Sequence, residues 1–231
     1  MTLAIIQGSS HKPERAEVNV VIDVIRAFTV AHHAFLMGAR EIILSPTIDA
    51  AFRLKESDED FLLAGEVEGL PIRGFDLDNS PWNLQGKNLC GKVLVQKTTN
   101  GVKAALNALA ADYVFITGFS NAKVTAEYIR ANLIRSGEVS HINLIASHPT
   151  GDEDLACAEY IAGIITGDSR VDAKEAAERI QRSGPAEKFL NRSRPEFKKE
   201  DILLCLEEID GSFIMQVNSD KGLPRIERIF I

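Results

Sequence analysis

The sequence predicts an α/β protein with three layers (α/β/α), in which helices cover both faces of a largely parallel sheet. Short apolar segments rich in β-branched residues alternate with segments of helical periodicity along most of the chain. Two successive β-α-β-α-β runs are separated by a long polar loop. Such alternation produces parallel strands whose connecting helices pack on the sheet. The length of 231 residues suits a single domain, with halves at about 1–88 and 89–231.

The first run opens at residues 18–24, where a nearly continuous β-branched segment is typical of a strand buried on both faces. Thr47 follows the second strand and can cap the free amides of the helix after it. The other elements expected here are a helix over 29–37, a strand over 41–44, a helix over about 47–55 and a strand over 61–64.

The second run follows a loop over 69–91 and repeats the same order. We expect strands over 92–96, 113–117 and 142–146, and helices over 102–110, about 121–135 and 152–165. After Gly167 the periodicity weakens. The remaining segments predict helices over 172–182 and 199–207, then two late strands over 212–217 and 225–231 that can pair antiparallel.

Composition limits the classes of partner. The formal net charge is −7, from 33 acidic and 26 basic residues, which argues against broad nucleic-acid binding but not against a small anion bound at local basic residues. The three cysteines form no CxxC pair, so neither a zinc site nor a disulfide framework is expected. No signal peptide and no membrane span of roughly 20 apolar residues is found. We therefore expect a cytoplasmic protein without membrane contact.

Polar residues collect where the predicted strands end. Ligands of open parallel sheets bind beyond the carboxyl ends of the strands. Asp23 interrupts an apolar strand, where a carboxylate is unfavourable unless it is paired or bound to a metal. It is a candidate ligand of Mg²⁺, which prefers oxygen donors, and the alternative is an ion pair with Arg26. Glu66 is a candidate second ligand or a base, with Glu68 as its competitor.

Acidic residues also open the helix expected at 152–165. Glu153 and Asp154 are candidate metal ligands, although acids at this position can simply complement the helix dipole. His148 just before this helix is a weaker candidate for moving a proton.

Two further segments are candidates for binding a phosphate group. Thr98, Thr99, Asn100 and Gly101 join a strand to a helix, where backbone amides and hydroxyls can hold an anion or merely cap the helix. The loop over 69–91 contains Asn79 and Ser80, which suit either a binding loop or a turn anchored by Trp82.

These same segments resemble the 2-phosphosulfolactate phosphatase family. The resemblance covers roughly residues 15–170, and the GFDLDNSP and TTNG segments are its most distinctive parts. It rests on VVIDVIRAFTV (20–30), GEVEGLPIRGFDLDNSP (65–81), KTTNGVKA (97–104) and DEDLACAEYIAG (152–163). The residues that match the family's motif positions are Asp23, Arg26, Glu66, Asn79, Ser80, Thr98, Thr99, Asn100, Gly101 and Asp154.

The resemblance implies a phosphatase that uses Mg²⁺ to hydrolyse a small anionic phosphate ester to sulfolactate and phosphate. Asp23, Arg26 and Glu66 are the expected catalytic residues, with attack by water or by Asp23 itself. The chain departs from the family pattern at Val67, where an Arg is usual, and at Phe28 and Lys97. Two alternatives therefore stay open. The substrate can be another small phosphorylated hydroxy acid, or the protein can be a non-catalytic homologue that binds an anion. A homodimer is compatible with such an enzyme.

Overall fold

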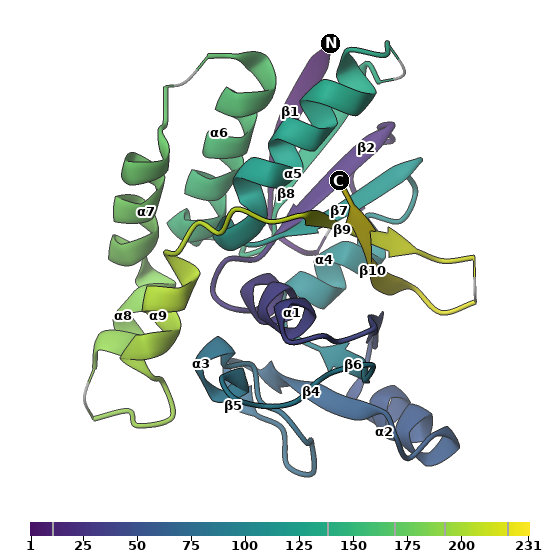
Figure 1. Cartoon of the computed structure of the whole chain (residues 1–231). Coiled ribbons are helices and arrows are strands. Elements are labelled where there is room, and N and C mark those ends of the chain that lie inside the picture. The colour runs from purple at the N-terminus through teal and green to yellow at the C-terminus, as the bar shows by residue number, and fades with distance from the viewer. Residues whose placement is uncertain (11, 138, 169, 192, 221) are drawn as a thin grey trace.

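The chain forms a central sheet with flanking helices, shown as a computed structural model in Figure 1. The structure describes residues 1–10, 12–137, 139–168, 170–191, 193–220 and 222–231. The strands are β1 (Thr2–Gln7), β2 (Val18–Ile22), β3 (Glu41–Leu44), β4 (Leu62–Val67), β5 (Leu70–Pro71), β6 (Val93–Lys97), β7 (Tyr113–Thr117), β8 (His141–Ala146), β9 (Phe213–Asn218) and β10 (Arg225–Phe230).

The helices agree with the expected pattern and add short ones. They are α1 (Ala27–Leu36), α2 (Ile48–Ser57), α3 (Pro81–Leu84), α4 (Gly101–Asn107), α5 (Ala122–Tyr128), α6 (Asp152–Thr166), α7 (Ala173–Arg182), α8 (Gly184–Leu190) and α9 (Lys199–Cys205). A 3₁₀ turn over Phe119–Asn121 precedes α5, and a π-helical turn over Ile129–Ile134 continues it. None of the described helices is long and apolar enough to cross a membrane.

The strand order is β1-β8-β2-β7-β9-β10-β3-β6-β4-β5 within the described residues. All pairs within the group β1, β8, β2 and β7 are parallel, as are those among β3, β6 and β4. The hairpin β9–β10 lies between these two groups and runs antiparallel to β7 and β3. The predicted antiparallel pairing of the late strands is therefore confirmed, and so is the α/β fold class.

The two predicted runs are both present in the element order, but the sheet interleaves their strands. β2 from the first run pairs with β7 and β8 from the second, and β6 from the second pairs with β3 and β4 from the first. Each parallel group thus combines strands from both runs.

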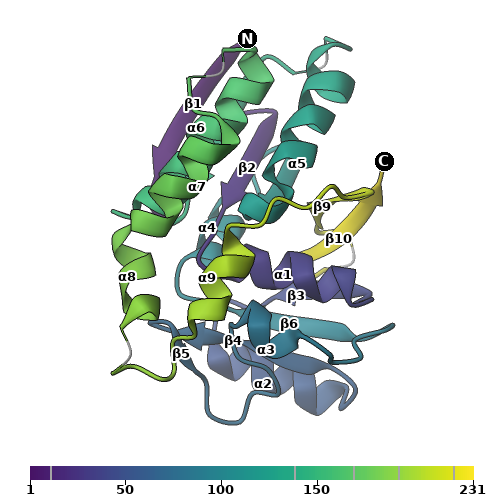
Figure 2. The same ribbon diagram turned by 60° about the vertical axis from the view of Figure 1, so that its left-hand side comes forward.

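The hairpin lets the sheet curve so that its two parallel groups approach each other across α1 and α4 (Figures 1 and 2). β7 and β9 share only two paired positions, and so do β10 and β3. One apolar cluster accordingly contains Val21 of β2, Leu94 of β6 and Phe28 of α1. The carboxyl ends of β2 and β6 therefore come close together, although the two strands are far apart in the order of the sheet.

The opposite faces carry separate apolar clusters. Val20 and Ile22 of β2 pack with α5 and α6 on one group, while Val93 and Val95 of β6 pack with α2 on the other. Alternation of side chains along a strand explains why neighbouring residues belong to different clusters.

The last helices cover the end of β2. α8 and α9 share a small apolar cluster of Phe189, Phe197 and Ile202, against which Ile25 from the end of β2 packs. Figure 2 shows α8 and α9 beside α3 and β5. The sequence pattern of this segment was weak. Its side chains lie at the edge of the sheet where the strands end, and the sequence analysis did not expect them there.

Candidate active site

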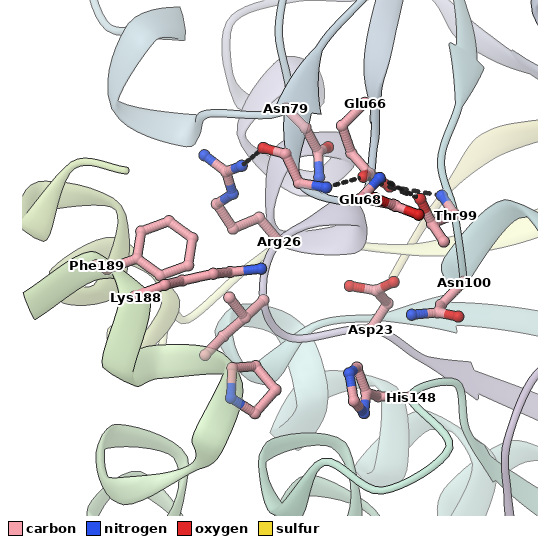
Figure 3. A pocket seen from close by; sticks show the side chains of 13 residues that line it. Asp23, Arg26, Glu66, Glu68, Asn79, Thr99, Asn100, His148, Lys188 and Phe189 are labelled. Atoms are coloured by element: carbon pink, nitrogen blue, oxygen red, sulfur yellow. Dashed lines mark hydrogen bonds between the residues drawn. The ribbon is translucent and has the colours of Figure 1, made fainter. Parts of the chain in front are cut away.

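A cavity of about 280 Å³ lies where the carboxyl ends of β2, β4 and β6 meet the segment after β8 and the start of α8 (Figure 3). Six of the residues expected from the sequence line it: Asp23, Arg26, Glu66, Asn79, Thr99 and Asn100. Glu68 and His148, which the sequence analysis weighed as weaker candidates, line it as well. Pro185, Lys188 and Phe189 of α8 complete the wall and were not expected.

Asp23 follows β2 directly, and its carboxylate points into the cavity (Figure 3). Oδ1 accepts a hydrogen bond from the backbone N–H of Ala27 at 2.9 Å, and Oδ2 lies 3.2 Å from Ser147 Oγ. Burial, followed by repulsion from Asp154 and Glu66, raises the pKa of Asp23 to about 8. The site therefore concentrates negative charge that a bound cation would relieve.

Gly101 explains how Asp23 fits beside α4. A Cβ atom on Gly101 would lie 2.6 Å from Asp23 Oδ2 and 3.0 Å from Ala27 Cβ. The glycine is therefore required by the close approach of the first turn of α4 to the Asp23 carboxylate. Its expected role as a phosphate ligand receives no support from its position, since it does not line the cavity.

Asp154 and Glu153 lie behind Asp23, at the start of α6. Asp154 Oδ1 accepts from the N–H of Val24 at 2.8 Å, while its Oδ2 accepts from Ser147 Oγ at 3.0 Å and from the N–H of His148 at 2.9 Å. Both side chains are buried but do not line the cavity, and Glu153 Oε2 has no hydrogen-bond partner among the described residues. Burial raises the pKa of each carboxyl group to about 7.

Glu66 is held by the backbone of two loops. Its Oε1 accepts from the N–H of Thr99, and its Oε2 accepts from the N–H of Gly69 and from Thr99 Oγ1. Thr99 Oγ1 in turn accepts from the N–H of Glu68 at 2.9 Å. These contacts fix the position of the Glu66 carboxylate at the cavity wall, with lone pairs left for a further ligand.

Arg26 is paired with an aspartate that the sequence analysis did not single out. Its Nη1 donates to Asp201 Oδ2 at 2.7 Å, and its Nη2 donates to the carbonyl oxygen of Gly69 at 3.0 Å. The alternative of an ion pair between Arg26 and Asp23 is therefore wrong: within the described residues the ion-pair partner of Arg26 is Asp201. Both terminal nitrogens of Arg26 hold neighbouring segments in place. Direct binding of phosphate by its guanidinium stays a prediction.

The remaining candidates divide between the cavity and helix caps. Ser80 Oγ donates to Asp201 at 2.6 Å and accepts from the N–H of Asn83, so it caps α3 outside the cavity. Thr98 Oγ1 accepts from the N–H of Val102 and also lies outside the lining. Asn79, in contrast, lines the cavity, and its Oδ1 is buried without a partner among the described residues.

Asn100, His148 and Lys188 supply polar groups around Asp23 (Figure 3). Asn100 Oδ1 accepts from Ser9 Oγ at 3.2 Å. His148 Nδ1 accepts from the N–H of Thr150 at 3.2 Å, which leaves the proton of the neutral ring on Nε2. Burial lowers the pKa of His148, and burial together with the charge of Arg26 lowers the pKa of Lys188.

The donor set fits Mg²⁺ only in part. No group of three or more His, Cys, Asp and Glu side chains among the described residues is arranged to hold a metal by itself. Mg²⁺ commonly binds through one or two carboxylates plus water and substrate phosphate. Asp23, with its raised pKa and its place at the cavity, meets that smaller requirement, and the unpaired Glu153 oxygen adds negative potential behind it.

Comparison with known proteins places the chain in a family. The model of the 2-phosphosulpholactate phosphatase family matches residues 4–220. The chain belongs to the 2-phosphosulfolactate phosphatase family. This phosphatase is 54% identical over all 231 residues to a probable 2-phosphosulfolactate phosphatase of Bacillus subtilis, with both chains fully covered.

More distant relatives carry the same description. A probable 2-phosphosulfolactate phosphatase of Carboxydothermus hydrogenoformans is 35% identical over 182 residues, which are 75% of this chain and 72% of the relative. One from Deinococcus radiodurans is 38% identical over 166 residues, covering 71% and 67%. The resemblance found in the sequence is thus confirmed, and the family consists of phosphoric monoester hydrolases.

Proposed function

We propose that this phosphatase hydrolyses 2-phosphosulfolactate to sulfolactate and inorganic phosphate, and that it uses Mg²⁺ bound at Asp23. The observation that supports this most strongly is the buried Asp23 carboxylate at a cavity also lined by Lys188, His148, Asn79 and Asn100. A cavity of about 280 Å³ has room for a small phosphate ester. The names of the family and of its relatives supply the substrate.

Asp23 is the residue that would hold the metal, with Glu66 at the same cavity as a second ligand. When bound, Mg²⁺ supplies positive charge for the phosphoryl oxygens and acidifies a coordinated water. Asp154 and Glu153 do not reach the cavity, so we assign them an indirect role. Through Ser147, whose hydroxyl lies between Asp23 Oδ2 and Asp154 Oδ2, Asp154 fixes the orientation of the Asp23 carboxylate.

The other lining residues bind and orient the ester. The Nε2–H of His148 can donate to a phosphoryl oxygen, because its Nδ1 already accepts from Thr150 and its lowered pKa keeps the ring neutral at pH 7. Asn79 and Asn100 present amide groups to the same space. Donors held in place before the reaction stabilise the charge that develops on the phosphoryl oxygens.

Attack by water is our preferred route, and attack by Asp23 on phosphorus is the alternative. Intact-mass measurement of acid-quenched enzyme during turnover separates the two. A phosphoryl adduct that is absent in Asp23→Asn supports the aspartyl route, whereas unmodified enzyme throughout supports water.

A panel of esters tests the substrate. We expect faster phosphate release from 2-phosphosulfolactate than from 2-phospholactate, 3-phosphoglycerate or phosphoserine, in the presence of Mg²⁺. Preference for another phosphorylated hydroxy acid would reassign the substrate, and binding without release from any ester would favour a non-catalytic role.

We further propose that the enzyme acts in the cytoplasm and forms a homodimer. Light scattering after size-exclusion chromatography tests the assembly, and a mass matching the single 25.3 kDa chain would refute it. Cell fractionation tests the location.

A further inference from the structure

The two sides of the cavity differ in charge. Asp23, Glu66 and Glu68 come from the strand ends, whereas Lys188 enters from α8 on the other side. Figure 3 shows the Lys188 side chain extended toward the side on which Asp23 lies. A substrate with two anionic groups can therefore place one near the metal proposed at Asp23 and the other near Lys188.

Lys188 is a cation at the cavity that makes no direct contact with a carboxylate among the described residues. Its Nζ lies 4.9 Å from the centre of the Phe197 ring and 5.6 Å from that of Phe189, and it forms no hydrogen bond or ion pair within the described part of the chain. The two neighbouring arginines are neutralised, Arg26 by Asp201 and Arg194 by Glu196. Of the three cations that contact this aromatic pair, Lys188 is the one for which no direct ion pair forms among the described residues, although the charges of Glu66 and Glu153 act on it from a distance.

Gly69 makes room for the ammonium group. A Cβ atom at this position would lie 3.1 Å from Lys188 Nζ and 3.0 Å from Phe197 Cε1, and the residue has a φ of +84°. The Gly69 N–H donates to Glu66 and its carbonyl accepts from Arg26, so its backbone is fixed on both sides. The approach of Lys188 to the loop is therefore built into the packing of this wall.

We propose that Lys188 binds the sulfonate of the substrate and thereby selects sulfonated esters. This inference rests on the proposed function. The phosphoryl group must lie near Asp23 to react, so a second anionic group falls toward the opposite wall. In 2-phosphosulfolactate the carboxylate is attached to the carbon that bears the phosphate, whereas the sulfonate is one carbon further away. The sulfonate is thus the group that reaches farthest from the scissile bond.

The decisive comparison uses two esters that differ only in the sulfonate. 2-Phospholactate keeps the phosphate and the carboxylate but has a hydrogen in place of the sulfonate. Lys188→Met should lower kcat/KM for 2-phosphosulfolactate by about 10- to 100-fold, mostly through KM, because a charge-assisted contact is lost. For 2-phospholactate the change should be less than about threefold.

Two variants complete the design. Lys188→Arg keeps the charge and should retain most of the preference for the sulfonated ester. Lys174→Met removes an exposed lysine of α7 and should leave both esters unchanged. Equal losses of kcat/KM on the two esters would overturn the proposal, because they would indicate that Lys188 contacts the phosphate or the carboxylate. An unchanged kcat/KM for both esters would overturn it as well.

Calorimetry separates this inference from the proposed function. Sulfolactate carries the sulfonate but no phosphate, so its binding does not depend on turnover. We expect wild type to bind sulfolactate more tightly than lactate, and Lys188→Met to lose most of that difference. Absence of phosphate release with intact, Lys188-dependent sulfolactate binding would refute only the hydrolysis. Sulfolactate binding that is undetectable, or unchanged by Lys188→Met, would refute the role of Lys188.

Discussion

Arg26 and Asp201, 175 residues apart in the sequence, form a buried ion pair in which Nη1 lies 2.7 Å from Oδ2. Asp201 Oδ1 also accepts from Ser80 Oγ at 2.6 Å and from the N–H of Trp82 at 3.1 Å. The pair therefore joins the end of β2, the loop before α3 and the helix α9 beside the active-site cavity. Removal of one partner leaves the other charge buried without compensation.

Asp201→Asn should lower the free energy of unfolding by about 3 kcal/mol or more, because Arg26 then lacks a counter-charge. Urea denaturation of the two proteins measures the difference. Asp210→Asn is the matched control, since the Asp210 side chain is 96% exposed in its pair with Lys123 and should change stability by less than about 1 kcal/mol. A loss for Asp201→Asn no larger than for the control would contradict a structural role of the pair.

Gly101→Ala should abolish most activity while the protein still folds. The new methyl group would lie 2.6 Å from Asp23 Oδ2, so the carboxylate has to move out of place. Displacement of a catalytic group by about 1 Å can reduce a rate by about 100-fold. Gly211→Ala is the control, because a Cβ atom there meets nothing closer than 3.6 Å. Full activity of Gly101→Ala would contradict the claim that catalysis depends on the position of the Asp23 carboxylate.

Glu153→Gln should stabilise the metal-free protein at pH 8 but not at pH 5. The pKa of Glu153 is raised from 4.5 to about 7, so the folded state binds more protons than the unfolded state between these values. Its contribution to stability is therefore complete below about pH 4.5 and is lost as the pH rises through about 7. A neutral amide avoids this loss, which we expect to be about 3 kcal/mol.

Thermal unfolding of Glu153→Gln in EDTA at both pH values tests this expectation. The exposed Glu175→Gln serves as a control that should follow wild type at each pH. An equal effect of Glu153→Gln at pH 5 and pH 8 would contradict the raised pKa.

Mg²⁺ should raise the melting temperature of wild type, and more at pH 8 than at pH 5.5. Protons compete with the metal for Asp23, whose pKa is raised to about 8, so binding strengthens as the pH rises. A metal at 100 times its Kd adds about 2.7 kcal/mol of stability. Differential scanning calorimetry with Mg²⁺ and with EDTA measures the shift. Asp23→Asn should abolish most of it, and a shift that survives this change would place the metal elsewhere.

Most of the fold followed from the sequence, because buried parallel strands such as β2 and β6 are largely apolar and rich in β-branched residues. β1 was missed, since it is an edge strand whose exposed and partly buried residues lack that pattern. The interleaved order of the strands in the sheet could not be predicted from the sequence either. It depends on the hairpin β9–β10 between the two parallel groups, a contact between segments distant along the chain.

The site was predicted where its residues follow strands. Asp23 and Glu66 were found because carboxylates at strand ends stand out against apolar neighbours. Lys188 lies in α8, which the sequence pattern did not predict, and Asp201 lies in the helix that was predicted over 199–207. Each acts through a contact with a residue more than 100 positions earlier, which no local pattern reveals. Only the aromatic Phe189 next to Lys188 set that segment apart from an ordinary surface helix.

Phosphate release from 2-phosphosulfolactate, measured with saturating Mg²⁺ and again with EDTA for wild type and Asp23→Asn, tests the central claim most directly. We predict release by wild type with Mg²⁺, and a loss of at least about 100-fold with EDTA or with the Asp23→Asn variant. Folding of the variant, confirmed by circular dichroism, makes the loss specific to the site. Release that persists in EDTA, or in folded Asp23→Asn, would contradict a magnesium-dependent reaction centred on Asp23.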